Sequence, residues 1–306
     1  MTTAINNDRR LIEELKRSIA AMVDDRSRKD TVGEAWLTNT DRLCQKILTS
    51  DPDDFLNWDM ISRTMVVGNA DFVRDELDFL KNLPDWKERW ENALEESPVG
   101  HPTYYDDFPS NSGNLIHQAY HLAQCEKTTG VDISRADFVF EFGGGYGSLC
   151  RLVHRLGFKG RYIIFDLPPF SALQIFFLKM NGISAISSNS SSAYTGKVSS
   201  GVICVSEIEH LESILADHAS TRNDVFIATW SLSEAPVMLR QAILPLLRPF
   251  SSFLVAYQGC FGDIDNVSFF DQWVNTVKHI EWRRWKIEHL PNQLYRDNYY
   301  LMGKKK

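Results

Sequence analysis

Apolar residues in the first hundred positions recur at helical spacing. Ile12, Leu15 and Ile19, for example, form one stripe, and further stripes follow it along the chain. Residues three or four positions apart lie on one face of a helix, so we expect four or five helices within residues 8–96. Prolines and a glycine in residues 98–102 then end this pattern. The spacing predicts a helical domain over the first hundred residues.

A different pattern follows, in which short continuous apolar runs alternate with helical stretches. Such runs are typical of parallel strands buried on both faces of a sheet. The expected strands span 138–142, 162–165, 202–205, 224–230 and 253–258. A helix over 269–277 precedes two consecutive strands, over 280–290 and 299–302. We therefore expect a division into residues 1–100 and 101–306, the second an α/β domain with a Rossmann-like, mostly parallel sheet and a closing antiparallel hairpin.

Between these regions, residues 103–112 carry turn signals, and we expect a loop there. A helix over 114–126 follows and places His117 and His121 on one face, at i and i+4. Gln118 stands where a zinc protease would have its glutamate. We interpret the two histidines as hydrogen-bonded residues and predict no metal site from them.

The expected strand 138–142 ends in a glycine-rich turn, and the expected strand 162–165 ends in Asp166. A dinucleotide fold requires G-x-G-x-x-G, with the third glycine allowing the helix to approach the strand. Counting from Gly143, that third position is Ser148. The spacing disfavours a nicotinamide cofactor and an oxidoreductase, while the strand, glycine turn, helix and carboxylate still indicate a ligand that contains a ribose.

The motif Glu141-Phe142-Gly143-Gly144-Gly145-Tyr146-Gly147 resembles the first motif of class I S-adenosylmethionine-dependent methyltransferases. A narrower resemblance, to bacterial proteins grouped as sugar O-methyltransferases, covers roughly residues 100–302. It is carried by that motif, by Phe165-Asp166-Leu167-Pro168 and by Trp230-Ser231-Leu232-Ser233-Glu234. The chain departs from the narrower pattern at Ala235-Pro236, where a methionine is expected.

The resemblance implies S-adenosylmethionine as cofactor. The implied cofactor-binding residues are Glu141, Gly143, Gly145, Gly147, Asp166, Glu207 and Trp230. In that family the glycine backbone lies under the methionine part of the cofactor, and the acidic residue at the second strand binds the ribose. The carboxyl ends of parallel strands meet at one edge, so Ser231 and Ser233 face the same crevice. With Tyr105 and Asn292 they are the expected substrate-binding residues.

Methyl transfer to a hydroxyl benefits from a base that removes the proton. Glu234, His117 and His289 are the candidates, in that order. The alternative for Ser233 and Glu234 is a role as helix caps, since small hydroxyl residues and acids are favoured in the first turn. A divalent metal held by Asp263, Asp265 and Asp271 is another route to the same chemistry, but acids at this spacing are ordinary on a loop surface.

The chain has 306 residues, a net charge of -7 and a pI near 5.6. This balance argues against a nucleic-acid partner. The five cysteines show no C-x-x-C spacing, no signal-peptide pattern begins the chain, and no apolar run reaches the roughly 20 residues of a membrane span. We expect a cytoplasmic protein, and the sequence leaves a homo-oligomer open.

The leading hypothesis is a methyltransferase that acts on a sugar hydroxyl, with a nucleotide sugar or a surface-polysaccharide unit as the acceptor. Two alternatives stay open at this point. One is methylation of a small molecule that is not a sugar. The other is a non-catalytic partner subunit that retains the methyltransferase fold.

Overall fold

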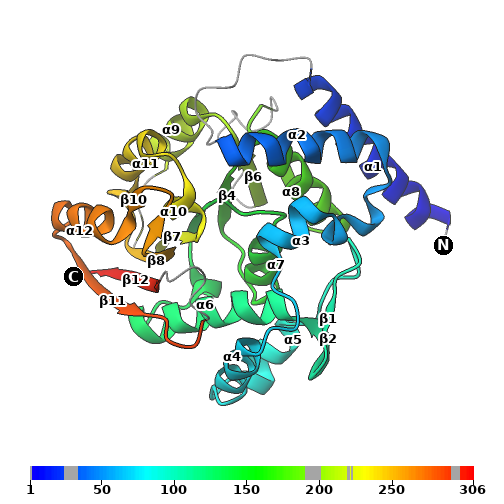
Figure 1. Ribbon diagram of the computed structural model, residues 1–306. Helices are drawn as coiled ribbons and strands as arrows, with labels where there is room; N and C mark the ends of the chain where they lie inside the picture. The colour runs from blue at the N-terminus through cyan, green and yellow to red at the C-terminus, as the bar shows by residue number, and fades with distance from the viewer. Residues whose placement is uncertain (1, 24–33, 190–200, 219–220, 222, 291–296) are drawn as a thin grey trace.

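The computed structural model describes residues 2–23, 34–189, 201–218, 221, 223–290 and 297–306. Its centre is an eight-stranded sheet with the order β11-β12-β8-β7-β3-β4-β6-β5 (Figure 1). The strands are β3 (Phe138–Phe142), β4 (Arg161–Phe165), β5 (Ala185–Ser187), β6 (Gly201–Val205), β7 (Asp224–Thr229), β8 (Ser252–Gln258), β11 (Ile280–Lys286) and β12 (Asn298–Lys305).

The strands from β8 to β5 are parallel, whereas β12 runs antiparallel between β8 and β11. The last strand of the chain therefore inserts beside the fifth expected strand and forms the closing hairpin with β11. This confirms the predicted Rossmann-like, mostly parallel sheet and its closing antiparallel hairpin. The edge strand β5 was not expected, because its three residues are too short to give a pattern.

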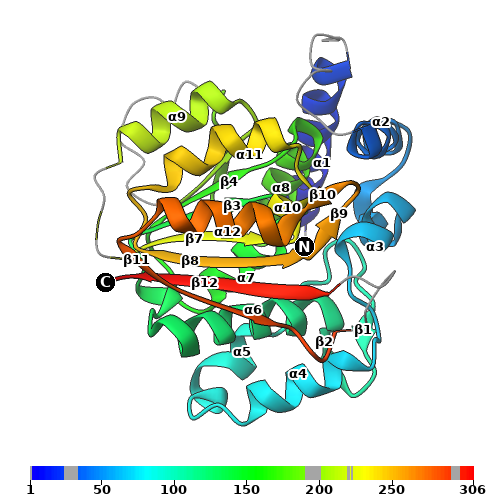
Figure 2. The same cartoon turned by 60° about the vertical axis from the view of Figure 1, so that its left-hand side comes forward.

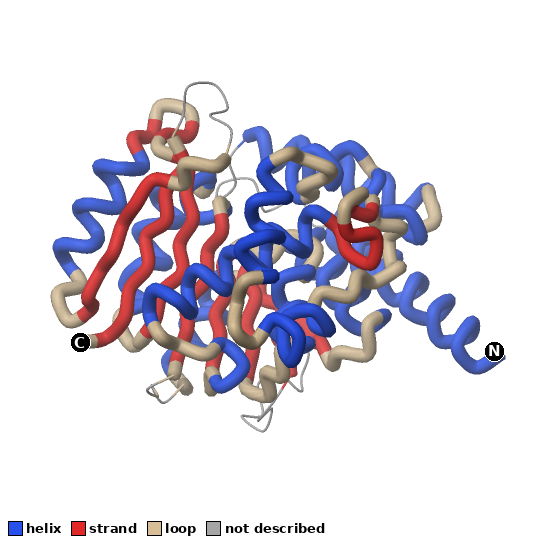
Figure 3. The backbone as a smooth tube through the Cα atoms, turned by 90° about the horizontal axis from the view of Figure 1, so that it is seen from below, coloured by secondary structure: helices blue, strands red, loops and turns tan. Residues whose placement is uncertain are grey.

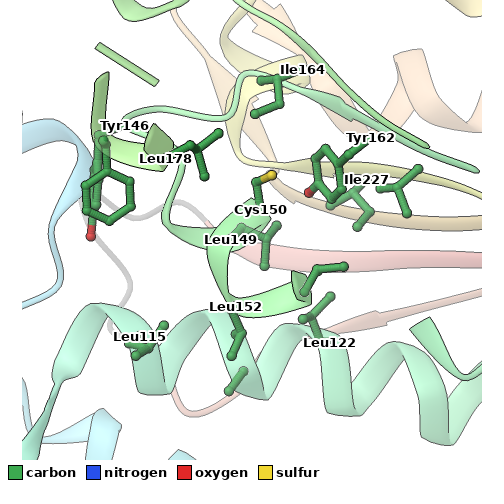
Figure 4. Close-up of a cluster of buried hydrophobic side chains, with 14 of the residues drawn as sticks. Leu115, Leu122, Tyr146, Leu149, Cys150, Leu152, Tyr162, Ile164, Leu178 and Ile227 are labelled. Carbon is green, nitrogen blue, oxygen red and sulfur yellow. The ribbon is translucent and has the colours of Figure 1, made fainter. Parts of the chain in front are cut away.

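Helices cover both faces of the sheet (Figure 2). On one face lie α9 (Ile208–Ala216), α10 (Ser231–Glu234), α11 (Val237–Ile243) and α12 (Asn266–Thr276). On the other lie α6 (Gly113–Thr129), α7 (Ser148–Arg155) and α8 (Pro168–Met180). Each face has its own buried apolar cluster. Figure 4 shows part of the cluster on the face covered by α6, α7 and α8, which includes Leu115 of α6, Leu149 of α7 and Tyr162 of β4. Burial on both faces explains the uninterrupted apolar runs.

The N-terminal region is helical. It contains α1 (Thr2–Val23), α2 (Glu34–Thr49), α3 (Asp59–Met65), α4 (Phe72–Lys81) and the short α5 (Glu91–Ala93), with 3-10 and π turns between them. Figure 3 shows these helices beside the strand layer. Helix α1 lies against α8, where Lys179 Nζ is 3.1 Å from Glu14 Oε2. Their buried side chains are continuous with the core under the sheet. The boundary at residue 100 stays a prediction.

Two local predictions are wrong. The expected loop over 103–112 is a hairpin of β1 (Tyr104–Tyr105) and β2 (Phe108–Ser112), because the two residues between them make a tight turn and Tyr105 is buried. From the sequence, Ser231, Ser233 and Glu234 are also expected to open a single helix that continues to Leu247, but this segment is split into α10 and α11 at Pro236, which has no N–H to donate. In addition, β11 ends four residues before the predicted end of its strand.

Candidate functional site

A glycine loop joins β3 to α7 at the carboxyl edge of the sheet. Gly143, Gly145 and Gly147 have φ angles of 73°, 57° and 98°, which side-chain-bearing residues rarely adopt. A Cβ on Gly143 would lie 2.2 Å from Ser231 Cβ, so only glycine lets the tips of β3 and β7 meet. A Cβ on Gly145 would lie 3.3 Å from Met65 Sδ. The loop is therefore bounded by β7 on one side and by the N-terminal helix α3 on another.

Asp166 follows β4 and is tied to this loop. Its Oδ2 accepts hydrogen bonds from Gly145 N–H (3.0 Å) and Gln174 Nε2 (2.8 Å), and its Oδ1 accepts from Leu167 N–H (2.8 Å). Burial raises the pKa of Asp166 to about 7, although these hydrogen bonds act in the opposite direction. The backbone N–H of Gly144 also acts to lower this pKa, so the glycine loop, Leu167 and Gln174 together hold the carboxylate in place.

Glu141 lies beneath the loop, inside the sheet. The side chain belongs to β3, the residue is 3 % exposed, and Oε2 accepts a hydrogen bond from the hydroxyl of Tyr162 at 2.7 Å. Burial raises its pKa to about 7. A Cβ on Gly144 would lie 3.3 Å from this carboxyl group. The structure thus places Glu141 against the underside of the turn.

Trp230 forms a strained turn at the end of β7. Its φ is 69°, a value that costs free energy for a bulky residue and is found mostly at functional sites. Hydrogen bonds hold the turn on both sides: Trp230 N–H donates to Ala256 O (2.7 Å), and Ser233 Oγ donates to Trp230 O (2.5 Å). Ser231 Oγ donates to Phe142 O and so links β7 to β3. Ser233 is fully buried inside α10, where no side chain caps the helix, so its hydroxyl bonds within the Trp230 turn and does not have the alternative role of a helix cap.

A buried carboxylate connects two of the candidate bases. Glu76 of α4 is 0 % exposed and accepts from His117 Nδ1 at 2.8 and 2.9 Å and from His289 Nε2 at 2.8 Å. Burial opposes the ionisation of Glu76, but the two imidazoles outweigh it and lower its pKa. Glu76 was not among the site residues expected from the sequence. The available signal was a glutamate on the apolar face of a helix, in the stripe of Val73 and Leu77.

The histidine group meets the Trp230 turn. The rings of His117 and Trp230 are parallel within 7°, with centroids 6.3 Å apart. His121 lies 4.1 Å from His117, centroid to centroid, and its Nδ1 bonds to the hydroxyl of Tyr300. Burial holds the pKa of His121 well below its usual range, so this ring is neutral. His121 Nε2 has no hydrogen-bond partner among the described residues.

Glu234 lies in a different hydrogen-bonded group. Gln258 Nε2 donates to Glu234 Oε1 at 2.8 Å, and the side chain of Trp36 in α2 also bonds to this carboxylate. Burial raises the pKa of Glu234. Glu234 and His117 are thus the candidate bases of two separate groups, both of which adjoin the turn formed by Trp230.

A pocket of about 270 Å³ lies beside the tip of β6. Glu207 and Ser206 line it, together with Ser171 of α8, and the hydroxyls of Ser171 and Ser206 are 2.8 Å apart. Helix α1 closes the pocket with Ser18 and Met22. The predicted position of Glu207 at the end of a strand is therefore correct, and the residue borders a hollow next to Asp166.

The remaining predicted residues lie elsewhere. Tyr105 is buried in the hairpin, where its neighbours are Arg74 and Asp107. Asn292 lies outside the described residues. Of the three acids considered for a metal, Asp265 caps α12 and Asp271 forms an ion pair with Arg284. Within the described ranges no group of three or more His, Cys, Asp or Glu residues is arranged to hold a metal ion. No described helix is both long and apolar enough to cross a bilayer.

No family model matches this chain, and no curated protein matches it. Three solved structures that resemble it are a protein of Thermoplasma acidophilum, a precorrin-6y C5,15-methyltransferase from Geobacter metallireducens and a magnesium protoporphyrin IX methyltransferase from Synechocystis with bound S-adenosylmethionine. Their identities are 11%, 13% and 11%, and their TM-scores are 0.41, 0.37 and 0.40. The matches cover 78%, 62% and 77% of this chain and 98%, 88% and 98% of theirs.

Proposed function

We propose that this protein is an S-adenosylmethionine-dependent O-methyltransferase whose acceptor is a sugar hydroxyl, in a nucleotide sugar or a surface-polysaccharide unit. One observation carries the proposal. The glycine loop, with Asp166 attached, and the His117–Glu76–His289 group converge on the strained turn of Trp230. In this proposal the glycine loop binds the cofactor and the histidine group accepts the proton, both at the edge of the sheet where α/β folds bind ligands.

The residues around the loop fit this cofactor. The positive φ angles of the three glycines let the loop turn tightly beside Asp166. Among the described residues Oδ1 of Asp166 accepts from Leu167 N–H, and a ribose hydroxyl would donate to this oxygen. We assign the ribose to Asp166, the methionine part to the backbone of Gly143–Gly147 and the adenine to the hollow beside Glu207. Glu141 supports the loop from below. The cofactor would supply a methyl group activated by a positively charged sulfur.

His117 is our first choice as the base. Glu76 holds its Nδ1, which fixes the ring and leaves Nε2 to take a proton. The carboxylate also stabilises the imidazolium that results. His289 bonds to the same carboxylate and could act as the base in the same way. Glu234, whose pKa is raised by burial, is the second candidate base. The indole of Trp230 offers an aromatic surface to the apolar face of a sugar ring.

Calorimetry with S-adenosylhomocysteine tests the cofactor assignment. We expect binding in the micromolar range for the natural chain and loss of binding for Asp166→Asn. No binding at high micromolar ligand would refute the proposal. If cofactor binds, methyl transfer to a panel of nucleotide sugars and oligosaccharides tests the acceptor. Transfer only to acceptors that are not sugars would overturn the sugar assignment and leave the methyltransferase assignment standing.

A further inference from the structure

A second pocket, of about 480 Å³, opens at the opposite edge of the sheet. Gly160, Ser184 and Gly201 line it, and these residues lie at or just before the beginnings of β4, β5 and β6. The glycine loop lies at the carboxyl ends of the same parallel sheet. The two sites are therefore separated by the length of the strands, and the proposed methyl transfer leaves this pocket without a role.

The lining of this pocket is basic. Its basic side chains are Arg151, His154, Arg155 and Lys159, and no carboxylate lines it. The first three are spaced i, i+3 and i+4 on α7 and so share one side of this helix. In a protein with a net charge of -7, four basic side chains around one hollow are a local exception.

Arg151 is the fixed element of the group. Its side chain is 6 % exposed, Nε donates to Asn181 Oδ1 at 3.0 Å, and Nη2 donates to the carbonyl oxygen of Glu95 at 2.8 Å. Nη1 has no hydrogen-bond partner among the described residues, although Glu96 Oε1 lies 3.6 Å away. This guanidinium therefore retains an unused donor, and an unmade hydrogen bond on a buried charged group is costly.

The other basic groups are more accessible. Arg155 is partly occupied, since its Nε donates to Ala93 O at 3.2 Å and its Nη2 lies 3.1 Å from Glu95 Oε2. The ammonium group of Lys159 is exposed and has no ion-pair partner within the described part of the chain. His154 donates from Nδ1 to Cys150 O at 2.8 Å, so Nε2 remains available. The group therefore combines the guanidinium of Arg151, held by two hydrogen bonds, with exposed positively charged side chains at the rim of the pocket.

We propose that this pocket binds a phosphate or pyrophosphate group. Guanidinium groups match the geometry of phosphate oxygens, and lysine adds a point charge. The volume exceeds that of a phosphate group alone, so an attached organic group also fits. Free phosphate and a nucleoside diphosphate are two sources of this chemistry, and the test separates them.

The test measures binding of inorganic phosphate, pyrophosphate and a nucleoside diphosphate to the full chain by calorimetry at low ionic strength. Lys159→Glu and Ser184→Glu place a negative charge at exposed rim positions without touching Arg151. Lys278→Glu makes the same charge change as Lys159→Glu at an exposed position outside the pocket and serves as the matched control. We expect both rim variants to weaken binding at least tenfold and the control to bind like the natural chain.

A second readout is the imidazole signal of His154 in an NMR titration, identified by its loss in His154→Gln. Burial and the charge of Lys159 lower the pKa of His154, and a bound phosphate should raise it. Tighter binding of the nucleoside diphosphate than of pyrophosphate identifies the organic source, and equal binding identifies free phosphate or pyrophosphate. Failure of all three anions to bind at low millimolar concentration overturns the proposal, as does equal binding by Lys159→Glu and the control. Neither result affects the cofactor assignment, because S-adenosylhomocysteine binding is measured separately.

Discussion

Replacing Glu76 by glutamine tests whether a buried carboxylate organises the two candidate bases. The substitution keeps the size of the side chain but removes its charge. In the natural chain the carboxylate is fully buried and bonds to His117 Nδ1 and His289 Nε2. Both imidazoles bond to the same oxygen, Oε1, and an amide oxygen in that place can still accept from both. The NH₂ group of the glutamine then takes the place of Oε2, which lies 2.9 Å from His117 Nδ1, so the charge and this second contact of His117 are lost.

The cost follows from these contacts. A hydrogen bond to a charged group contributes about 1.5–3 kcal/mol, and removal of one member of a buried ion pair costs about 3–5 kcal/mol. Because glutamine preserves hydrogen bonds to the imidazoles but removes the charge, we expect Glu76→Gln to lower the free energy of unfolding by about 2–3 kcal/mol at pH 7. For a chain of this size that corresponds to a decrease in Tm of about 3–5 °C.

The effect should depend on pH in a defined direction. The pKa of Glu76 is lowered in the folded protein, so its ionised form is the one that stabilises the fold. That contribution is fully present above the unfolded pKa of about 4.5 and disappears as the pH falls through the lower folded pKa. The difference in unfolding free energy between the natural chain and Glu76→Gln should therefore shrink below about pH 4.5.

Urea unfolding at several pH values measures this difference. Glu88→Gln is the matched control, since Glu88 is exposed and should change the free energy of unfolding by no more than about 0.5 kcal/mol. If Glu76→Gln behaves like this control at pH 7, or if its effect is the same at pH 4 and pH 7, the carboxylate does not organise the histidines as an ion. A cycle with His289→Gln should give a coupling of about 1–3 kcal/mol, and additivity would contradict the shared contact.

Three further predictions concern the glycine loop with Asp166 and the turn at Trp230. Asp166→Asn should weaken S-adenosylhomocysteine binding by at least about 100-fold, or about 2.7 kcal/mol. In the natural chain the affinity for S-adenosylhomocysteine should rise from pH 6 to pH 8, because hydroxyl donors favour the ionised carboxylate and the pKa of Asp166 is raised to about 7. An affinity that does not change with pH would contradict this. Gly143→Ala should lower both stability and cofactor affinity, since the new methyl group would meet Ser231, whereas Gly68→Ala meets no atom within 4 Å and should change neither. Trp230→Gly should unfold at a temperature at or above that of Trp230→Ala, because glycine tolerates a φ of 69°; a clearly less stable glycine variant would argue against strain at this turn.

The features that were predicted from the sequence are local ones. The glycine spacing and Asp166 are read directly from consecutive residues, and the hairpin that closes the sheet follows from two strands with no helix between them. Glu76 could not be found in this way, because its partners lie 41 and 213 residues away along the chain. Backbone strain at Trp230 has no sequence signal, since tryptophan is not a residue that favours a positive φ.

Two of the expected substrate-binding residues are buried for a common reason. Ser233 was expected at the site because it follows a strand and Tyr105 because of the family resemblance, and each is buried by packing between distant elements. Ser233 hydrogen-bonds to the Trp230 turn, and Tyr105 becomes part of a hairpin beside α4. Position at a strand end predicts proximity to a crevice but does not fix the direction in which a short side chain points.

Helix α4 contributes the counter-ion for two imidazoles that belong to the other part of the chain, one in α6 and one after β11. A chimera that joined residues 101–306 to the helices of a relative would bring these imidazoles without their acidic partner. A recombination experiment would therefore have to keep α4 together with the sheet, or supply an equivalent glutamate in the new N-terminal helices. The segment most easily mistaken for a removable appendage thus completes the hydrogen-bonded group of His117 and His289.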